Sequence, residues 1–280
     1  MRDYDLSERR ACRLTGLARS TYRYACKRKA DEALRKRLCE LAGERPRFGT
    51  PRLTVLLRQE FGAVNHKRIE RLYREERLQL PRKRKKRRRG IKRAPLVQPD
   101  RIGQRWSLDF MSDSLSDGRR FRLLCIIDDF SRQALAIEVD TSISGERVTR
   151  VLDRLIEHHG LPEVLVTDNG PEFTSRAMLL WAEERGIALH YIDPGKPMQN
   201  AFVESFNGRV RDECLNPSWF SNLQHARMHI NDWRRDYNEK RPHSSLNYLA
   251  PDVFANRWKM SAGPPKFKLN LSLTPVQTQG

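Results

Sequence analysis

The 280-residue sequence is poor in cysteine and contains no long apolar run. Its five cysteines, at positions 12, 26, 39, 125 and 214, form no CxxC pair and have no histidine pair at zinc spacing beside them. A scattered, odd set of this kind argues against a disulfide framework or a structural zinc and for reduced thiols. No segment approaches the roughly 20 apolar residues of a membrane span, and the N-terminus lacks the apolar core of a signal peptide. We therefore expect a soluble cytoplasmic protein with no membrane partner.

Positive charge is abundant, and it is unevenly distributed. Residues 1–100 contain 31 Lys and Arg against 12 Asp and Glu, a net charge of +19, which is the net charge of the whole chain. The remaining residues hold 23 basic and 23 acidic side chains. An asymmetry this large favours a polyanion partner, most simply DNA or RNA, over an ordinary solvated surface.

Residues 1–45 carry the signals of short helices. Ser7 is an expected N-cap, and Gly16 is an expected break between two helices. This N-terminal segment is therefore predicted to be helical and is a possible helix-turn-helix.

Residues 46–80 show the same pattern more clearly. Thr50 is expected to cap a helix with Pro51 at its first position, Gly62 to end it, and Asn65 to cap a second, strongly basic helix. The apolar side chains expected to face inward from the first helix are Leu53, Leu56, Leu57 and Phe61. Two short helices joined by a glycine turn, the second basic, are typical of a helix-turn-helix DNA-binding domain. A small helical bundle with no role in DNA binding is the alternative.

The basic side chains of these segments are the expected DNA contacts. On the second helix of 46–80 they are Lys67, Arg68 and Arg71. In the linker 81–100 they are Arg82, Lys83, Arg84, Lys85, Lys86, Arg87, Arg88 and Arg89. Ten of the twelve residues in RKRKKRRRGIKR (82–93) are basic. Such a run cannot pack into a core, so we expect a mobile tether that binds a phosphate backbone. The composition is equally compatible with a nuclear-localisation signal.

From residue 101 the pattern changes to alternating strands and helices. Three strands come first and later strands alternate with amphipathic helices, which predicts an α/β domain over 101–260 with a mixed sheet flanked by helices. The expected strands are 105–111, 121–130, 133–140, 163–168 and 187–192, and Trp106, Trp181 and Trp233 are expected in the core. Residues 261–280 form a C-terminal tail.

Three acidic side chains occupy unusual positions in this predicted sheet. Asp109 lies between apolar residues inside the first strand, where an unpaired charge is costly to bury. Asp168 follows the strand EVLVT, at the carboxyl end where α/β sheets place functional groups. Glu204 comes after 35 intervening residues, enough for a helix, a strand and a return to the same edge.

Three carboxylates at one sheet edge have the chemistry that phosphoryl transfer with two divalent ions requires. Mg²⁺ and Mn²⁺ prefer oxygen ligands, and in such sites one ion activates the attacking oxygen while the other stabilises the leaving one. The alternative is that each acid is structural: Asp168 caps a turn, Glu204 lies on a solvated helix face and Asp109 lies in a surface strand. Taken together, the three positions favour the metal site.

The helix that carries Glu204 is expected to present a polar stripe facing away from the core. At about 100° per residue, Asn200, Glu204, Asn207 and Arg211 fall on one narrow line opposite the apolar side chains. Arg211 is a candidate phosphate contact, while Asn200 and Asn207 either contact DNA or cap and solvate the helix.

Other polar residues have competing interpretations. Asp128 and Asp129 end the second strand before a turn, where turn capping is favoured over metal ligation. Asn169 and Gly170 are expected to shape the exit that orients Asp168, with a DNA contact by Asn169 as a secondary role. His243 either binds DNA or is structural, and the structural role is favoured.

Three sequence motifs resemble those of a known superfamily. WSLDF, VTDNGPEF and GKPMQNAFVESFNGRVRDECLN resemble the Asp, Asp and Glu motifs of DDE transposases and retroviral integrases, including the 35-residue spacing and an Arg seven positions past the Glu. The chain is most similar to the second-frame product of bacterial insertion sequences that encode their transposase in two overlapping frames. FGTPRLTVLLRQEFGAVNHKRIERLYREERL and WRRDYNEKRPHSSLNYLAPDVFA resemble the helix-turn-helix and C-terminal integrase-core segments of that family.

The resemblance implies a ribonuclease-H-like fold in which Asp109, Asp168 and Glu204 are a catalytic triad that binds two Mg²⁺ or Mn²⁺ ions. It implies cleavage at the terminal inverted repeats of an element and joining to target DNA, in the bacterial cytoplasm at the nucleoid. A homo-multimer and the product of the upstream frame are expected partners. A ribonuclease-H-like nuclease and an inactive DNA-binding regulator are the alternatives. The basic N-terminal region counts against the first of these, and the three intact acids count against the second.

Overall fold

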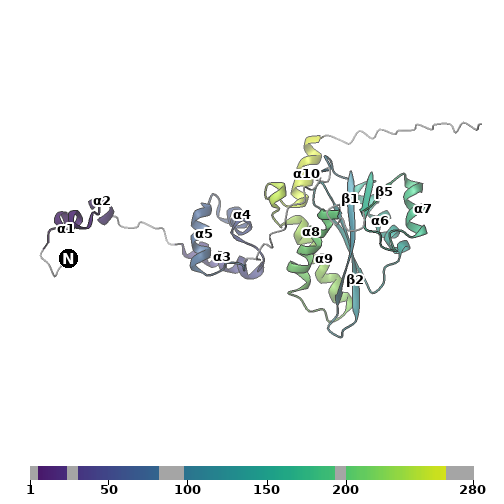
Figure 1. The fold of residues 1–280 in the computed structure, drawn as a ribbon, viewed down its shortest axis with the longest axis horizontal. Coiled ribbons are helices and arrows are strands. Elements are labelled where there is room, and N and C mark those ends of the chain that lie inside the picture. Colours follow the sequence, from purple (N-terminus) through teal and green to yellow (C-terminus); the bar gives the residue numbers. More distant parts are fainter. Residues whose placement is uncertain (1–5, 24–30, 82–97, 193–199, 263–280) are drawn as a thin grey trace, which may run out of the picture.

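The computed structural model describes residues 6–23, 31–81, 98–192 and 200–262. The predicted DNA contacts from Arg82 to Arg89 lie outside these ranges. Figure 1 shows helices near the N-terminus followed by a sheet with helices on both of its sides.

Two short helices open the described chain, as the N-terminal segment predicts. Helix α1 (Glu8–Thr15) begins where the Ser7 hydroxyl accepts a hydrogen bond from the Arg10 N–H, and it ends at Gly16. Gly16 adopts φ 67°, a left-handed conformation that glycine tolerates best. Helix α2 (Arg19–Tyr22) follows the turn.

Three helices then form a small bundle, α3 (Glu32–Glu44), α4 (Thr50–Phe61) and α5 (His66–Glu75). Its centre consists of fully buried aliphatic side chains: Leu38, Leu53, Leu57, Ile69 and Leu72. Asn65 caps α5 by accepting from the Lys67 N–H, as predicted.

Two details of this bundle differ from prediction. Helix α4 begins one residue early, with Gly49 as its N-cap and Thr50 as its first residue. Phe61 was expected inside, but its side chain is 43% exposed. Phe61 is the last residue of α4, so it lies at the end of the helix, where the chain turns at Gly62.

The sheet has five strands and is mixed, which confirms the predicted fold class. The strands are β1 (Arg105–Ser114), β2 (Arg120–Asp128), β3 (Ala134–Asp140), β4 (Val164–Thr167) and β5 (Ala188–Tyr191). Their spatial order is β3-β2-β1-β4-β5. The pairs β1–β2 and β2–β3 are antiparallel, whereas β1–β4 and β4–β5 are parallel. The carboxyl ends of β1, β4 and β5 therefore point the same way.

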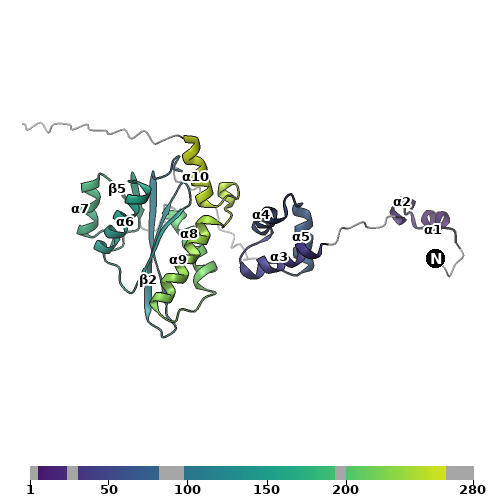
Figure 2. The ribbon, with the colours of Figure 1, turned by 180° about the vertical axis from the view of Figure 1, so that it is seen from behind.

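Alternation along β2 divides the apolar side chains between two cores. Leu124 and Ile126 pack toward α6 (Gly145–His159) and α7 (Arg176–Arg185), with Trp106 and Trp181 buried as predicted. The odd-numbered side chains of β2 instead face α8 (Ala201–Val210) and α9 (Leu223–Glu239). The two helix pairs lie on opposite sides of the sheet (Figure 1, Figure 2).

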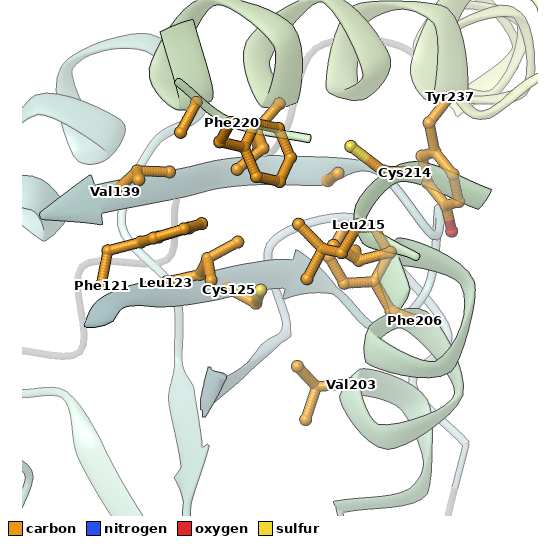
Figure 3. Close-up of a cluster of buried hydrophobic side chains, with 14 of the residues drawn as sticks. Phe121, Leu123, Cys125, Val139, Val203, Phe206, Cys214, Leu215, Phe220 and Tyr237 are labelled. Atoms are coloured by element: carbon orange, nitrogen blue, oxygen red, sulfur yellow. The ribbon is translucent and has the colours of Figure 1, made fainter. Parts of the chain in front are cut away.

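The core beneath α8 and α9 joins these helices to the sheet (Figure 3). Val203 and Phe206 extend from α8, and Tyr237 extends from α9. Helix α8 continues without a break into a π-helical turn, Arg211–Leu215, whose Cys214 and Leu215 are buried in the same cluster. Trp233 packs against this core, as predicted. The last helix of the described residues is α10 (Pro251–Ala262).

Within the described residues, no helix combines the length and apolarity needed to cross a bilayer. The four cysteines in the same part of the chain, at positions 12, 39, 125 and 214, are free thiols.

His243, which follows α9, has a structural role in this fold. Its ring is 3% exposed and lies 4.6 Å from the Tyr237 ring, edge to face. The pKa of His243 is lowered to about 2, mainly because the ring is buried and also because the positive charges of Arg241, Arg209 and Arg52 lie nearby. The imidazole is therefore held neutral in the folded chain.

This depressed pKa predicts a loss of stability in mild acid. Between the ordinary histidine pKa of 6.5 and the folded value of about 2, the unfolded chain binds one more proton than the folded chain. The free energy of unfolding should therefore fall as the pH drops below 6.5, by about 1.4 kcal/mol per pH unit from this group. Urea unfolding of wild type and His243→Asn between pH 7 and 5 measures the effect. An equal pH slope in both proteins would contradict it.

Candidate active site

Asp109 and Asp168 lie at the same level of two adjacent parallel strands. In the β1–β4 ladder, Ser107 pairs with Val166. If this register is continued by two residues on each strand, Asp109 is level with Asp168, which directly follows Thr167, the last residue of β4. Both side chains are half-buried. The parallel register thus brings together two of the three predicted acids.

The environment of Asp109 makes its ionisation unfavourable. Burial is the main cause that raises its pKa to about 6, and the negative charges of Asp168 and Glu204 raise it as well. Two hydrogen bonds oppose these effects: the Phe110 N–H donates to Oδ1 at 2.8 Å, and the Asn207 Nδ2 donates to Oδ2 at 2.7 Å. The negative charges of Asp168 and Glu204 thus both act on Asp109.

Helix α8 is attached to β1 by a row of side-chain hydrogen bonds. Asn200 Nδ2 donates to the Leu108 carbonyl at 3.1 Å, and Arg211 Nη2 donates to the Ser112 carbonyl at 2.9 Å. The Asn207 bond to Asp109 lies between them along the helix. Glu204, one turn before Asn207, is exposed in the first turn of α8.

The expected solvent-facing stripe is therefore wrong in part. Asn200 and Asn207 are only 2% and 8% exposed, because they bond to the adjacent strand rather than to water. Glu204 and the half-buried Arg211 remain accessible on the same line. Helical periodicity grouped the four residues correctly but could not indicate that a strand edge lies against the stripe.

The turn after β4 holds Asp168 in place, as its sequence predicts. The Gly170 N–H donates to Asp168 Oδ1 at 3.0 Å, and Asn169 Nδ2 donates to the Ile192 carbonyl after β5 at 2.9 Å. A Cβ at position 170 would lie 3.0 Å from Asp168 Oδ1, closer than most real contacts. Glycine at position 170 therefore leaves room for the Asp168 carboxylate.

An ion pair beside this turn was missed by the sequence reasoning. Arg122 on β2 pairs with Glu172, and the Arg122 guanidinium lies over the Phe110 ring at 4.2 Å from its centroid. Glu172 is within VTDNGPEF, and Arg122 is a basic residue between the apolar residues Phe121 and Leu123 of β2. A basic residue in this position was the sequence feature that could have indicated the ion pair.

The donor atoms at this edge are those that a hard divalent cation prefers. Asp109, Asp168 and Glu204 offer carboxylate oxygens only, and a cation would offset the negative charges that raise the pKa of Asp109. Among the described residues, no three His, Cys, Asp or Glu side chains are close enough to surround a metal ion. The donor chemistry fits Mg²⁺ or Mn²⁺, although the three acids do not form a closed ligand cage.

The basic residues predicted on α5 are partly neutralised within the bundle. Arg68 and Arg71 both pair with Asp31, whose pKa is lowered because their hydrogen bonds and charges outweigh its burial. Lys67 is exposed at the start of α5. Any DNA contact by Arg68 or Arg71 therefore competes with Asp31.

Asp128 and Asp129 have structural contacts. Asp128 is fully buried and accepts from the N–H groups of Gly103, Phe130 and Ser131 and from the Ser131 hydroxyl. This confirms turn capping for Asp128. Asp129 instead pairs with Arg105 at 2.5 Å, and burial raises its pKa to about 6.

Family models match most of the chain. The integrase core domain matches residues 99–197 and 185–251, and an HTH-like domain matches residues 28–86. These spans cover both the three-helix bundle and the sheet.

Relatives from insertion elements match over three quarters or more of this chain. The 31.7 kDa protein of insertion element IS407 from Burkholderia multivorans is 52% identical over 262 residues, 93% of this chain and 95% of that protein. The 39.2 kDa protein of IS476 from Xanthomonas euvesicatoria is 49% identical, covering 91% of this chain and 74% of that protein. Transposase InsD of insertion element IS2A/D/F/H/I/K from Escherichia coli is 26% identical over 77% of this chain and 75% of that protein.

The fold has a counterpart among solved structures. A chain of the simian T-cell lymphotropic virus intasome, solved with PP2A regulatory subunit B56 gamma, has a TM-score of 0.52 at 16% identity. The match covers 87% of this chain and 78% of that chain. The sheet and its helices are thus ribonuclease-H-like, as in retroviral integrase cores.

We predict that Asp128 is needed for folding rather than for metal binding. Asp128→Ala leaves several buried N–H and O–H donors without an acceptor, so the free energy of unfolding should fall by about 3 kcal/mol. Urea denaturation measures this, with Asp117→Ala in the exposed β1–β2 turn as the control. A variant as stable as wild type would contradict the capping role.

Proposed function

This chain belongs to the integrase-core family of insertion-element proteins, and we propose that it is a DNA transposase that cuts element ends and joins them to target DNA. The observation that carries the proposal is the meeting of Asp109 and Asp168 on parallel strands, with Glu204 acting electrostatically on the same carboxyl group. A partly buried carboxylate with two further negative charges acting on it is costly unless a cation offsets the charge. The family membership supports DNA as the substrate.

Asp109, Asp168 and Glu204 are the proposed ligands of two Mg²⁺ or Mn²⁺ ions. When bound, such a pair supplies charge stabilisation to the attacking and leaving oxygens of the phosphodiester. The chain's own contribution is positional: Asn207 holds Asp109 Oδ2, and Gly170 holds Asp168 Oδ1. These hydrogen bonds aim the carboxylates before any substrate arrives.

The basic N-terminal third is the proposed DNA-binding region. Its net charge of +19 supports tracking of a phosphate backbone, and the exposed Lys67 on α5 supports contact by the HTH-like domain. The proposed DNA partners are the terminal inverted repeats and target DNA. A homo-multimer would hold two ends together, and the upstream-frame product remains a proposed partner.

Strand transfer tests the activity. With labelled terminal-repeat DNA, a target plasmid and Mg²⁺, wild type should produce joined products. Asp168→Asn and Glu204→Gln should lower the rate by about 10²–10³-fold, because each removes a charged ligand for the transition state. The matched control is Asp117→Asn, which changes an exposed carboxylate in the β1–β2 turn and should leave the rate unchanged.

The pattern of products distinguishes the competing functions. Cleavage without joining would favour a nuclease. DNA binding without cleavage, with the upstream-frame product also supplied, would support an inactive regulator and contradict the transposase proposal.

DNA binding should weaken steeply with salt. Each phosphate contact contributes about 0.9 to the slope of log affinity against log salt concentration, so replacing the eight basic residues 82–89 with Gln should flatten that slope markedly. Fluorescence anisotropy with labelled duplex DNA across a salt series measures it. Arg154→Gln with Arg185→Gln, on α6 and α7, serves as the charge control. Unchanged affinity and slope in the linker variant would contradict the assignment.

A further inference from the structure

The three-helix bundle α3–α5 is attached to the integrase core by a paired contact. Arg45, which ends α3, donates Nη1 and Nη2 to the two carboxylate oxygens of Asp236 on α9, each at 2.6 Å. The two side chains are 21% and 27% exposed. A bidentate, largely buried pair of this kind fixes orientation as well as distance.

The ring of Phe48 is the apolar centre of the same junction. Phe48 is 3% exposed, and the guanidinium groups of Arg45, Arg52 and Arg241 lie 5.1, 5.3 and 5.6 Å from its centroid. Arg45 and Arg52 belong to the bundle, whereas Arg241 belongs to the core. A cation over an aromatic face is attracted to it, so the ring links the two parts.

Arg241 connects the Phe48 junction to the integrase core. Its side chain is 2% exposed, and its Nε and Nη2 donate to Glu213 at 2.8 and 2.5 Å. The guanidinium also lies 5.5 Å from the Tyr237 ring centroid. Removing either member of so buried a pair leaves an uncompensated charge, so the two side chains hold each other firmly in place.

Glu213 belongs to the helix that carries the proposed active-site residues. It lies in the π-helical turn Arg211–Leu215, which continues α8 directly. π-helical turns within longer helices are frequent at functional sites. Phe206 of α8 also packs edge to face on Tyr237, with ring centroids 5.0 Å apart (Figure 3). One continuous path thus connects Phe48 to the helix that presents Glu204 and Asn207.

We propose that Arg241 is a positioning residue for the active site, and that docking of the α3–α5 bundle sets the position of α8 through it. This inference rests on the proposed function. In the docked bundle, Phe48 and Arg52 pack beside Arg241. Arg241 pairs with Glu213, and this pair fixes the C-terminal end of α8. In the same C-terminal half of the helix, the Asn207 bond to Asp109 and the Arg211 bond to the Ser112 carbonyl join α8 to β1. A movement of the bundle when it binds DNA would therefore change the position of the active-site carboxylates.

Charge reversal across the junction tests the link in the full-length chain. Arg45→Asp sets two carboxylates against each other and should undock the bundle. Adding Asp236→Arg restores an opposite pair and should redock it. Hydrogen–deuterium exchange of residues 201–215 should accelerate in Arg45→Asp and return toward the wild-type rate in the double variant. Arg37→Gln, which breaks a pair with Glu60 inside the bundle, is the matched control and should leave α8 exchange unchanged.

Activity provides the second readout. At saturating DNA, the strand-transfer rate of Arg45→Asp should fall by about ten-fold or more, since a misplacement of about 1 Å can cost about 10²-fold, and it should recover in the double variant. Arg241→Lys keeps the charge but loses the planar fork, and should lower the rate similarly with little change in KM. Arg227→Lys on α9 controls for a surface arginine and should retain the wild-type rate.

The two readouts separate the possible failures. If α8 exchange responds but wild type never joins DNA, the mechanical link stands and the transposase proposal falls. If Arg45→Asp undocks the bundle, seen as faster exchange around Asp236, while exchange in 201–215 is unchanged, the positioning inference is overturned whatever the activity. A rate that fails to recover in the double variant despite restored exchange would also overturn it.

Discussion

The hydrogen bond from Asn207 to Asp109 is the contact on which the geometry of the candidate site depends. Asp109 is a half-buried carboxylate in the sheet with two other acids nearby, so its charge needs a donor. Asn207 supplies that donor at 2.7 Å and at the same time fixes the rotation of α8. Because Glu204 lies one turn earlier, it is oriented by the same bond. A shift of α8 by one residue would turn the helix by about 100° and separate the acids.

Helix α8 meets this constraint because both of its sides are used. Val203, Phe206 and Val210 enter the core shared with β2 and α9, while Asn200 and Asn207 bond to β1. The polar contacts therefore prevent α8 from sliding along β1, and the apolar contacts fix its distance from the sheet. Its π-helical extension adds Glu213, whose pairing with Arg241 connects the site to the bundle. Precision at the carboxylates thus depends on contacts well beyond them.

The fold was largely predictable, because alternation, capping and glycine breaks are local signals. The five strands and the caps at Ser7 and Asn65 follow from short windows of sequence. Short windows of sequence do not predict three other features: the burial of Asn200 and Asn207, the pairing of Arg68 and Arg71 with Asp31, and the burial of Arg241. Each of these depends on a partner far away in the chain, and a polar residue shows no local sign of whether water or protein will satisfy it. The prediction that Phe61 is buried was wrong because an apolar residue at a helix end need not contact the core.

The sequence by itself determined the order of strands and helices, the concentration of positive charge in the first third and the motifs shared with DDE transposases and integrases. Only the tertiary structure decided which polar groups meet. Asn207 and Asp109 are 98 residues apart, and Arg45 and Asp236 are 191 apart. Such pairs are selected by the packing of α8 and α9 on the sheet, because a hydrogen bond is strong only at one distance and angle. Periodicity states which side chains share a face of a helix. Packing decides what that face touches.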